Sequence, residues 1–171
     1  MALSWGCALA DNLQNILLVC GGNTGSSPMA ESLANDYFHF SVDGYRAFSR
    51  GIHANPQQTM PEENAVIVMQ QWKSTTEIEK HRALPVTAED IHVAAMVLTM
   101  TAAQKETLQL LYPSAAHKIW MLSQCATGLS QDVHDMYGHD LAFYQQTSQQ
   151  IAHYLQLIQA HRFKCYQNPA Q

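Results

Sequence analysis

The stretch Ile16-Leu17-Leu18-Val19-Cys20-Gly21-Gly22-Asn23-Thr24-Gly25-Ser26-Ser27-Pro28-Met29-Ala30-Glu31 decides the fold. It begins with four apolar residues, β-branched at both ends, and such a run suits a strand that is buried on both faces. Seven small residues follow Cys20, and three of them are glycines, which accept positive φ and let a ligand approach the backbone closely. We expect Ser27 to cap a helix that has Pro28 at its first position and Glu31 in its first turn.

A strand, a glycine-rich loop and a helix N-terminus in this order predict an anion-binding site. Cys20 stands at the entrance of the loop. There, the loop N–H groups and the helix dipole would stabilise a thiolate and make the cysteine nucleophilic. A Walker-type nucleotide loop is excluded, because the sequence lacks the lysine of its Gly-Lys-Ser/Thr ending.

This stretch resembles the phosphate-binding loop of the low-molecular-weight protein tyrosine phosphatases, which reads Cys-x-Gly-Asn-x-Cys-Arg-Ser-Pro-Met-Ala-Glu after a strand. The matching residues are Cys20, Gly22, Asn23, Ser27, Pro28, Met29, Ala30 and Glu31. Two positions depart from the family pattern, because Gly25 replaces its second cysteine and Ser26 replaces its arginine. Gly25 therefore removes the disulfide that some members form inside the loop.

A second stretch, Asp132-Val133-His134-Asp135-Met136-Tyr137-Gly138, resembles the Asp-Pro-Tyr/Phe-Gly loop that carries the general acid of this family. The resemblance makes Asp135 the acid and places Tyr137 at the rim of the cleft. Met136 replaces the proline that would stiffen the loop, so the position of Asp135 is expected to be less fixed. On spacing alone, aspartates three residues apart are also typical of a solvated turn.

Two further residues match the family. Ser49-Arg50-Gly51 corresponds to the Ser-Ala-Gly that ends its second strand, so Ser49 is a candidate hydrogen-bond partner of the loop through Asn23. A serine at this point could equally cap a turn. His81 matches a histidine of the family, but a lone histidine is more often structural than catalytic, and we assign it no chemistry.

Strands are expected to alternate with helices along the chain. The predicted strands are 16–19, 44–48, 93–100 and 117–122, and the predicted helices are 28–38, 61–71, 87–91, 102–111 and 141–161. This alternation predicts an α/β fold with a doubly wound, four-stranded parallel sheet and helices on both faces, as in the low-molecular-weight phosphatases. Ligands of such folds bind at the carboxyl ends of the strands, where Cys20 lies.

The chain is predicted to have one domain. Residues 15–163 would form a single phosphatase-like domain, preceded by an extension over 1–14 that does not look like a signal peptide and followed by a flexible, glutamine-rich tail over 164–171. The 171 residues carry a formal charge of −5, which argues against a nucleic acid or an anionic membrane as partner. No apolar run approaches the ~20 residues of a membrane span.

The four cysteines are Cys7, Cys20, Cys125 and Cys165. Their spacing matches neither a C-x-x-C pair nor a zinc site, so we expect no metal and no cofactor. Reduced thiols in a cytoplasmic protein are the simplest interpretation.

The resemblance implies a reaction in two steps. The Cys20 thiolate attacks phosphorus while Asp135 protonates the leaving group, and Asp135 then activates water to hydrolyse the phosphocysteine. Ser27 would hydrogen-bond the thiolate. The implied substrate-binding residues are Gly21, Gly22, Asn23, Thr24, Gly25, Ser26, Ser27 and Tyr137, with Ser49 in support.

The serine at position 26 predicts weak activity. A guanidinium donates two charge-assisted hydrogen bonds to the transferring phosphoryl group, whereas a hydroxyl donates one neutral bond. An arginine in phosphoryl transfer can be worth roughly 10³ to 10⁵ in rate. Arg50, near the end of the second strand, could rescue part of this loss.

Three functions remain open. The chain could be a weak phosphatase acting on phosphotyrosine or phosphoarginine in proteins, and Thr24, which resembles the threonine of bacterial protein-arginine phosphatases, favours the latter unless it merely fits the loop. It could be a pseudophosphatase that binds a phosphorylated protein or a small oxyanion without turnover. It could also be a phosphocysteine carrier, since IIB components of sugar phosphotransferase systems carry phosphocysteine on a similar loop without arginine. Oligomeric state is left open.

Overall fold

Four parallel strands form one sheet, and the computed structural model describes residues 14–38 and 44–167. The strands are β1 (Gln14–Cys20), β2 (Tyr45–Gly51), β3 (Ala94–Thr99) and β4 (Ile119–Met121). Their order across the sheet is β2-β1-β3-β4, and all three neighbouring pairs are parallel. The predicted fold class is confirmed. Residues 1–13 of the predicted extension lie outside the described residues, and Gln14 already belongs to β1.

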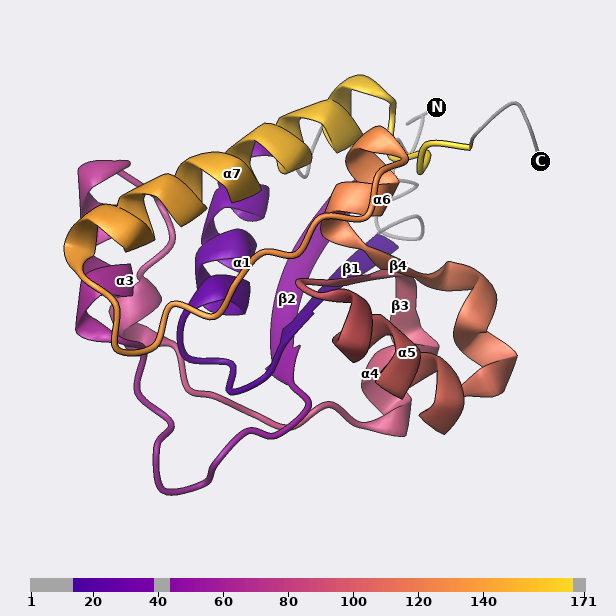
Figure 1. Cartoon of the computed structure of the whole chain (residues 1–171), viewed down its shortest axis with the longest axis horizontal. Helices are drawn as coiled ribbons and strands as arrows, with labels where there is room; N and C mark the ends of the chain where they lie inside the picture. Colours follow the sequence, from indigo (N-terminus) through magenta and orange to yellow (C-terminus); the bar gives the residue numbers. More distant parts are fainter. Residues whose placement is uncertain (1–13, 39–43, 168–171) are drawn as a thin grey trace, which may run out of the picture.

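Helices cover both faces of the sheet (Figure 1). One face carries α1 (Ser26–Tyr37) and the long α7 (Leu141–Ala160), together with α3 (Glu63–Gln71) and α6 (Leu122–Thr127). The other face carries α4 (Ala88–Val93) and α5 (Ala102–Leu111). Two 3₁₀ segments, η1 (Ile78–Lys80) and η2 (Pro113–Lys118), lie in the connections. No helix in the described part of the chain is both long enough and apolar enough to cross a membrane.

The apolar run at the start of the quoted stretch is buried on both faces, as predicted. Ile16, Leu18 and Cys20 belong to the core under α1 and α7, whereas Leu17 and Val19 belong to the core under α4 and α5. This alternation follows from the period of two along a strand. It directs the Cys20 side chain toward α1.

The start of α1 differs from the prediction. The helix begins at Ser26 with Gly25 as its N-cap, so Ser27 is the second helical residue and caps nothing. Pro28 is tolerated there, because the first N–H groups of a helix have no partner within it. Glu31 lies in the second turn, beyond the first-turn position expected from the sequence.

The other helices follow local signals, with one exception. Thr87 and Thr101 form complete capping boxes at the starts of α4 and α5, which matches their predicted positions. Helix α6 was not predicted, because its six residues follow β4 directly and are too few to show a period. It ends at Gly128, which has a left-handed φ of 78°.

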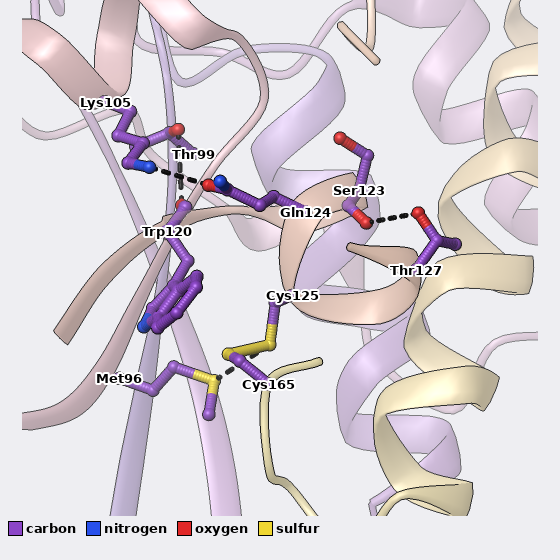
Figure 2. Close-up of a disulfide and its surroundings, with 9 residues drawn as sticks. All are labelled: Met96, Thr99, Lys105, Trp120, Ser123, Gln124, Cys125, Thr127 and Cys165. Atoms are coloured by element: carbon purple, nitrogen blue, oxygen red, sulfur yellow. Dashed lines mark hydrogen bonds between the residues drawn. A yellow bond between two sulfur atoms is a disulfide. The ribbon is translucent and has the colours of Figure 1, made fainter. Parts of the chain in front are cut away.

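Cys125 and Cys165 form a disulfide, with an S–S distance of 2.08 Å (Figure 2). The prediction of reduced thiols is therefore wrong for this pair, and it no longer supports a cytoplasmic location. The backbone N–H of Tyr166 also donates to the carbonyl oxygen of Cys125, at 2.8 Å. The beginning of the predicted flexible tail is thus held against α6, while 168–171 lie outside the described residues. Forty residues separate the two cysteines, so spacing did not reveal the pair.

Breaking this disulfide should lower stability. We expect Cys165→Ser to reduce the free energy of unfolding by about 2–4 kcal/mol, because the cross-link restricts the unfolded chain. Urea unfolding with and without dithiothreitol measures the effect, and Cys7→Ser is the matched control. The reductant should lower the stability of the unsubstituted chain and of the control, and leave Cys165→Ser unchanged. Equal stability under oxidising and reducing conditions would contradict the assignment.

Candidate active site

The loop of residues 21–25 lies at the carboxyl edge of the sheet. It connects Cys20, the last residue of β1, with Ser26, the first residue of α1. Strand β2 is longer than predicted and pairs with β1 up to Gly51, which lies opposite Cys20. This is the edge at which open α/β sheets bind their ligands.

The Cys20 thiol is almost fully buried at the bottom of the loop. Its Sγ lies 2.9 Å from Ser27 Oγ, and the backbone N–H of Asn23 donates to it at 3.2 Å. Ser27 Oγ accepts a hydrogen bond from the Asn23 side chain, so its own proton is available to the sulfur. The predicted contact between Ser27 and the thiol is confirmed. The sulfur therefore lies among hydrogen-bond donors at the N-terminus of α1.

Asn23 gives the loop its turn. Its φ of 59° is left-handed, a conformation that asparagine adopts more readily than most residues. The loop glycines do not use the positive φ that glycine accepts, because the described glycines with positive φ are Gly44, Gly128 and Gly138.

Four groups hold Asn23 in this conformation. Its Nδ2 donates to Ser27 Oγ and to Ser49 Oγ, each at 2.9 Å, and its Oδ1 accepts from the backbone N–H of Leu84 at 3.0 Å. His81 Nε2 lies 2.9 Å from the Asn23 carbonyl oxygen. The predicted contact with Ser49 is confirmed. His81 is a supporting residue that the sequence analysis left without a role, although its match to a family histidine was the available signal.

Ser49 is itself oriented by Glu31. Its hydroxyl donates to Glu31 Oε2 at 2.5 Å, which leaves a lone pair for the Asn23 amide. The Glu31 carboxylate thus supports the loop through Ser49.

Gly51 is needed for close approach between β2 and the loop. A Cβ at this position would lie 2.7 Å from the carbonyl oxygen of Gly21. Any larger residue would push the loop away from the strand.

A cleft of about 530 Å³ opens beside the loop. Gly22 and Thr24 of the loop line it, and so do Asp135 and Tyr137. Tyr137 is 69% exposed, so it lies at the rim, as predicted. Asp135 Oδ1 accepts from the backbone N–H of Tyr137 at 3.0 Å. The two motifs that lie far apart in the sequence therefore meet at one cleft.

Buried side chains fix the Asp135 loop without the proline. Val133 and Met136 are each 1% exposed and lie on either side of Asp135 in the sequence. The backbone N–H of Val133 also donates to the carbonyl oxygen of Met100, at 2.8 Å, just beyond the end of β3. Burial of the Val133 and Met136 side chains thus fixes this segment, as the proline ring would in the family motif. Asp132 points elsewhere, because its Oδ1 accepts from the backbone N–H of Ala102.

Arg50 does not replace the missing arginine, so the suggested rescue is wrong. It pairs with Val19 in the sheet and thus lies on the face opposite Cys20. Its Nε lies 3.2 Å from Asp90 Oδ2, and Nη1 donates to the carbonyl oxygen of Ser49. Ser26 itself is buried at the start of α1. No lysine or arginine lines the cleft among the described residues, and no described group of His, Cys, Asp and Glu could hold a metal ion.

The family model for low molecular weight phosphotyrosine protein phosphatases matches residues 15–162. The chain belongs to this family. It is similar to a protein-arginine-phosphatase of Bacillus subtilis, with 30% identity over 150 residues that span 84% of this chain and 93% of the relative. It is also similar to the low molecular weight protein-tyrosine-phosphatase PtpB of Staphylococcus epidermidis, with 30% identity covering 80% of this chain and 90% of the relative.

A solved low molecular weight protein tyrosine phosphatase from T. tengcongensis has the same fold. Its TM-score to this chain is 0.80 at 32% sequence identity, and the match covers 86% of this chain and 99% of that one. The family membership and the fold that were predicted from the two motifs are confirmed.

Removing the Asn23 side chain should loosen the loop of this phosphatase-family protein. We expect Asn23→Ala to lower the free energy of unfolding by about 2–4 kcal/mol, because buried hydrogen bonds are lost and alanine disfavours the left-handed conformation. Urea unfolding measures the change. The exposed Asn55→Ala is the control and should stay within about 0.5 kcal/mol of the parent chain. An Asn23→Ala chain as stable as the control would contradict the conclusion that the Asn23 side chain holds the loop.

Arg50→Ala should leave anion binding unchanged, since this guanidinium lies on the far face of the sheet. Titration with inorganic phosphate, followed by calorimetry, measures the affinity. Arg46→Ala, at an exposed position nearer the start of β2, is the control for the loss of one positive charge. A decrease in affinity that is specific to Arg50→Ala would bring Arg50 back into the site.

Proposed function

We propose that this chain is a cysteine-dependent phosphatase of weak activity that acts on phosphotyrosine or phosphoarginine in proteins. The observation that carries the proposal is the Cys20 thiol, which lies within a loop at a helix N-terminus and receives hydrogen bonds from Ser27 and from the backbone of Asn23. Membership of the family supports the same reaction.

In the first step, the Cys20 thiolate attacks phosphorus in line and the bond to the leaving group breaks. Asp135, which lines the cleft beside the loop, gives its proton to the leaving oxygen or nitrogen. The product is a phosphocysteine, surrounded by the loop residues 21–25 and by Ser26 and Ser27 of α1. The backbone N–H groups of the loop and of the first turn of α1 would carry the charge that develops on the phosphoryl oxygens.

In the second step, Asp135 takes a proton from a water molecule, which attacks the phosphocysteine and releases phosphate. Cys20 leaves as a thiolate, and the Ser27 hydroxyl stabilises it by the contact already present. The exposure of Asp135 is compatible with this exchange of protons with water. No metal is needed in this sequence of steps, because main-chain donors supply the stabilisation.

Ser26 makes both steps slow. The family's arginine would donate two charge-assisted hydrogen bonds to equatorial oxygens, and a serine hydroxyl donates one neutral bond. A loss of roughly 10³ to 10⁵ in rate corresponds to about 4–7 kcal/mol of barrier. The described residues of the cleft include no other arginine or lysine to compensate.

The substrate class is proposed from two observations. Relatives at about the same identity include a protein-arginine-phosphatase and a protein-tyrosine-phosphatase, so both kinds of phosphoprotein remain in the proposal. Thr24, whose side chain lines the cleft, favours phosphoarginine through its resemblance to the arginine-directed branch.

A second candidate follows from Ser26. A site that keeps its main-chain donors and lacks the arginine could hold a phosphorylated protein or an oxyanion without hydrolysing it. The absence of the arginine is also compatible with a phosphocysteine carrier, in which the covalent intermediate persists.

Single-turnover assays distinguish these functions. We expect slow hydrolysis of p-nitrophenyl phosphate or phosphoarginine by the unsubstituted chain, abolition by Cys20→Ser, and a gain of at least ~10²-fold in rate for Ser26→Arg. Mass spectrometry of the quenched reaction detects phosphocysteine. Activity in Ser26→Arg alone would favour the binding function, and an accumulated phosphocysteine in the unsubstituted chain would favour the carrier. Hydrolysis that survives in Cys20→Ser would overturn the proposed mechanism.

A further inference from the structure

Glu62 places a carboxylate beside the loop. It precedes α3 and serves as its N-cap residue. The Thr24 hydroxyl donates to Oε1 at 2.8 Å, and the Tyr144 hydroxyl of α7 donates to Oε2. The backbone N–H of Glu62 donates to the carbonyl oxygen of Thr24 at 2.9 Å. Three hydrogen bonds, two of them to the loop residue Thr24, therefore fix this carboxylate against the loop.

The carboxylate lies where the family's second cysteine would begin. A Cβ at Gly25 would lie 2.8 Å from Glu62 Oε2 and 3.1 Å from its Cδ. Only glycine leaves room for a carboxylate in this position, so the departure at Gly25 and the presence of Glu62 form one feature. Its effect is to bring a negative charge onto the loop backbone, next to the position that has lost its arginine.

The surroundings do not cancel this charge. The cleft is lined by Glu62 and Asp135, and its remaining titratable lining residues are His53 and Tyr137. Tyr144 is a hydrogen-bond donor to Glu62, and burial together with this contact raises the pKa of Tyr144, so it stays neutral. An anion in the loop is thus attracted by main-chain N–H groups and repelled by a fixed carboxylate.

Thr24 also presents a hydrogen-bond acceptor to the cleft. Because its hydroxyl proton is donated to Glu62, its oxygen offers a lone pair to the cleft. The wall formed by Thr24 and Glu62 therefore presents acceptors. A phosphoryl group that carries N–H donors or a positive charge beside the phosphorus is complementary to such a wall, and an isolated dianion is not.

We infer that Glu62 is a specificity-determining residue, which selects against dianionic groups and in favour of groups with a lower net negative charge. The inference rests on the proposed function, because it assigns a selectivity to the same loop. It explains Gly25 and Thr24 together through one carboxylate.

Sulfate and sulfamate test the inference, because they are tetrahedral anions of similar shape with charges of −2 and −1. The Coulomb energy with a fixed charge is proportional to the charge of the ligand, so the factor for sulfate should be the square of the factor for sulfamate. For Glu62→Gln we expect the dissociation constant to fall about tenfold for sulfate and about threefold for sulfamate. Isothermal calorimetry at low ionic strength measures both.

Three matched variants complete the experiment. Glu63→Gln removes the same charge from the neighbouring, exposed residue and should change neither constant by more than about twofold. Tyr144→Phe removes a hydrogen bond without a change in charge, so any shift should be equal for the two anions. Glu62→Ala removes the same charge without introducing an amide. It should therefore show the same larger effect on sulfate than on sulfamate, even if the glutamine of Glu62→Gln perturbs the loop.

Equal factors for the two anions in Glu62→Gln and Glu62→Ala would overturn the inference and leave Glu62 a positioning residue for Thr24. Unchanged or weaker sulfate binding, or no measurable binding by either variant, would also overturn it. None of these outcomes depends on turnover, so they are distinguishable from failure of the proposed function, which the Cys20→Ser and phosphocysteine measurements decide.

Discussion

Asn23 occupies a left-handed conformation in the middle of the loop, and the site depends on the groups that hold it there. Its amide joins Ser27 of α1 to Ser49 of β2, while its carbonyl oxygen meets His81. Its own N–H is directed at the Cys20 sulfur as a result. The thiol environment is thus produced by a network that spans the first two strands and the connection to α4.

The site has the shape of an anion-binding loop, but a carboxylate lies beside it and the arginine of the family is missing. The loop, the helix N-terminus and the buried thiol form an anion cradle of the phosphatase family. The arginine position is occupied by the buried Ser26, and the nearest arginine of β2 lies on the other face of the sheet, bound to Asp90. A carboxylate from Glu62 lies against the loop instead. Positive charge in the cradle therefore comes mainly from main-chain dipoles, which act only over short distances.

The segment that carries Asp135 is fixed at both of its ends. Helix α6 precedes it and is cross-linked to Cys165, and α7 follows it, capped by Asp140. Between them, Val133 and Met136 are buried in the core under α7. Figure 1 shows the segment running from α6 to the start of α7. Its conformation thus follows from packing rather than from the proline that this family motif usually contains.

Sequence alone determined the strand, loop and helix around Cys20, the parallel sheet and the family, because these depend on local patterns: a buried apolar run, small residues, alternating strand and helix segments, and two motifs in order. It also predicted the contact between Asn23 and Ser49, which followed from the resemblance. Only the tertiary structure decided which loop residue is left-handed, which face Arg50 occupies, that Cys125 and Cys165 are joined, and that Glu62 reaches the loop. Each of these depends on groups that approach through folding, such as Thr24 and Glu62, which are 38 positions apart. Spacing along the sequence does not predict such a contact, because the same helices and strands can be placed relative to one another in many ways.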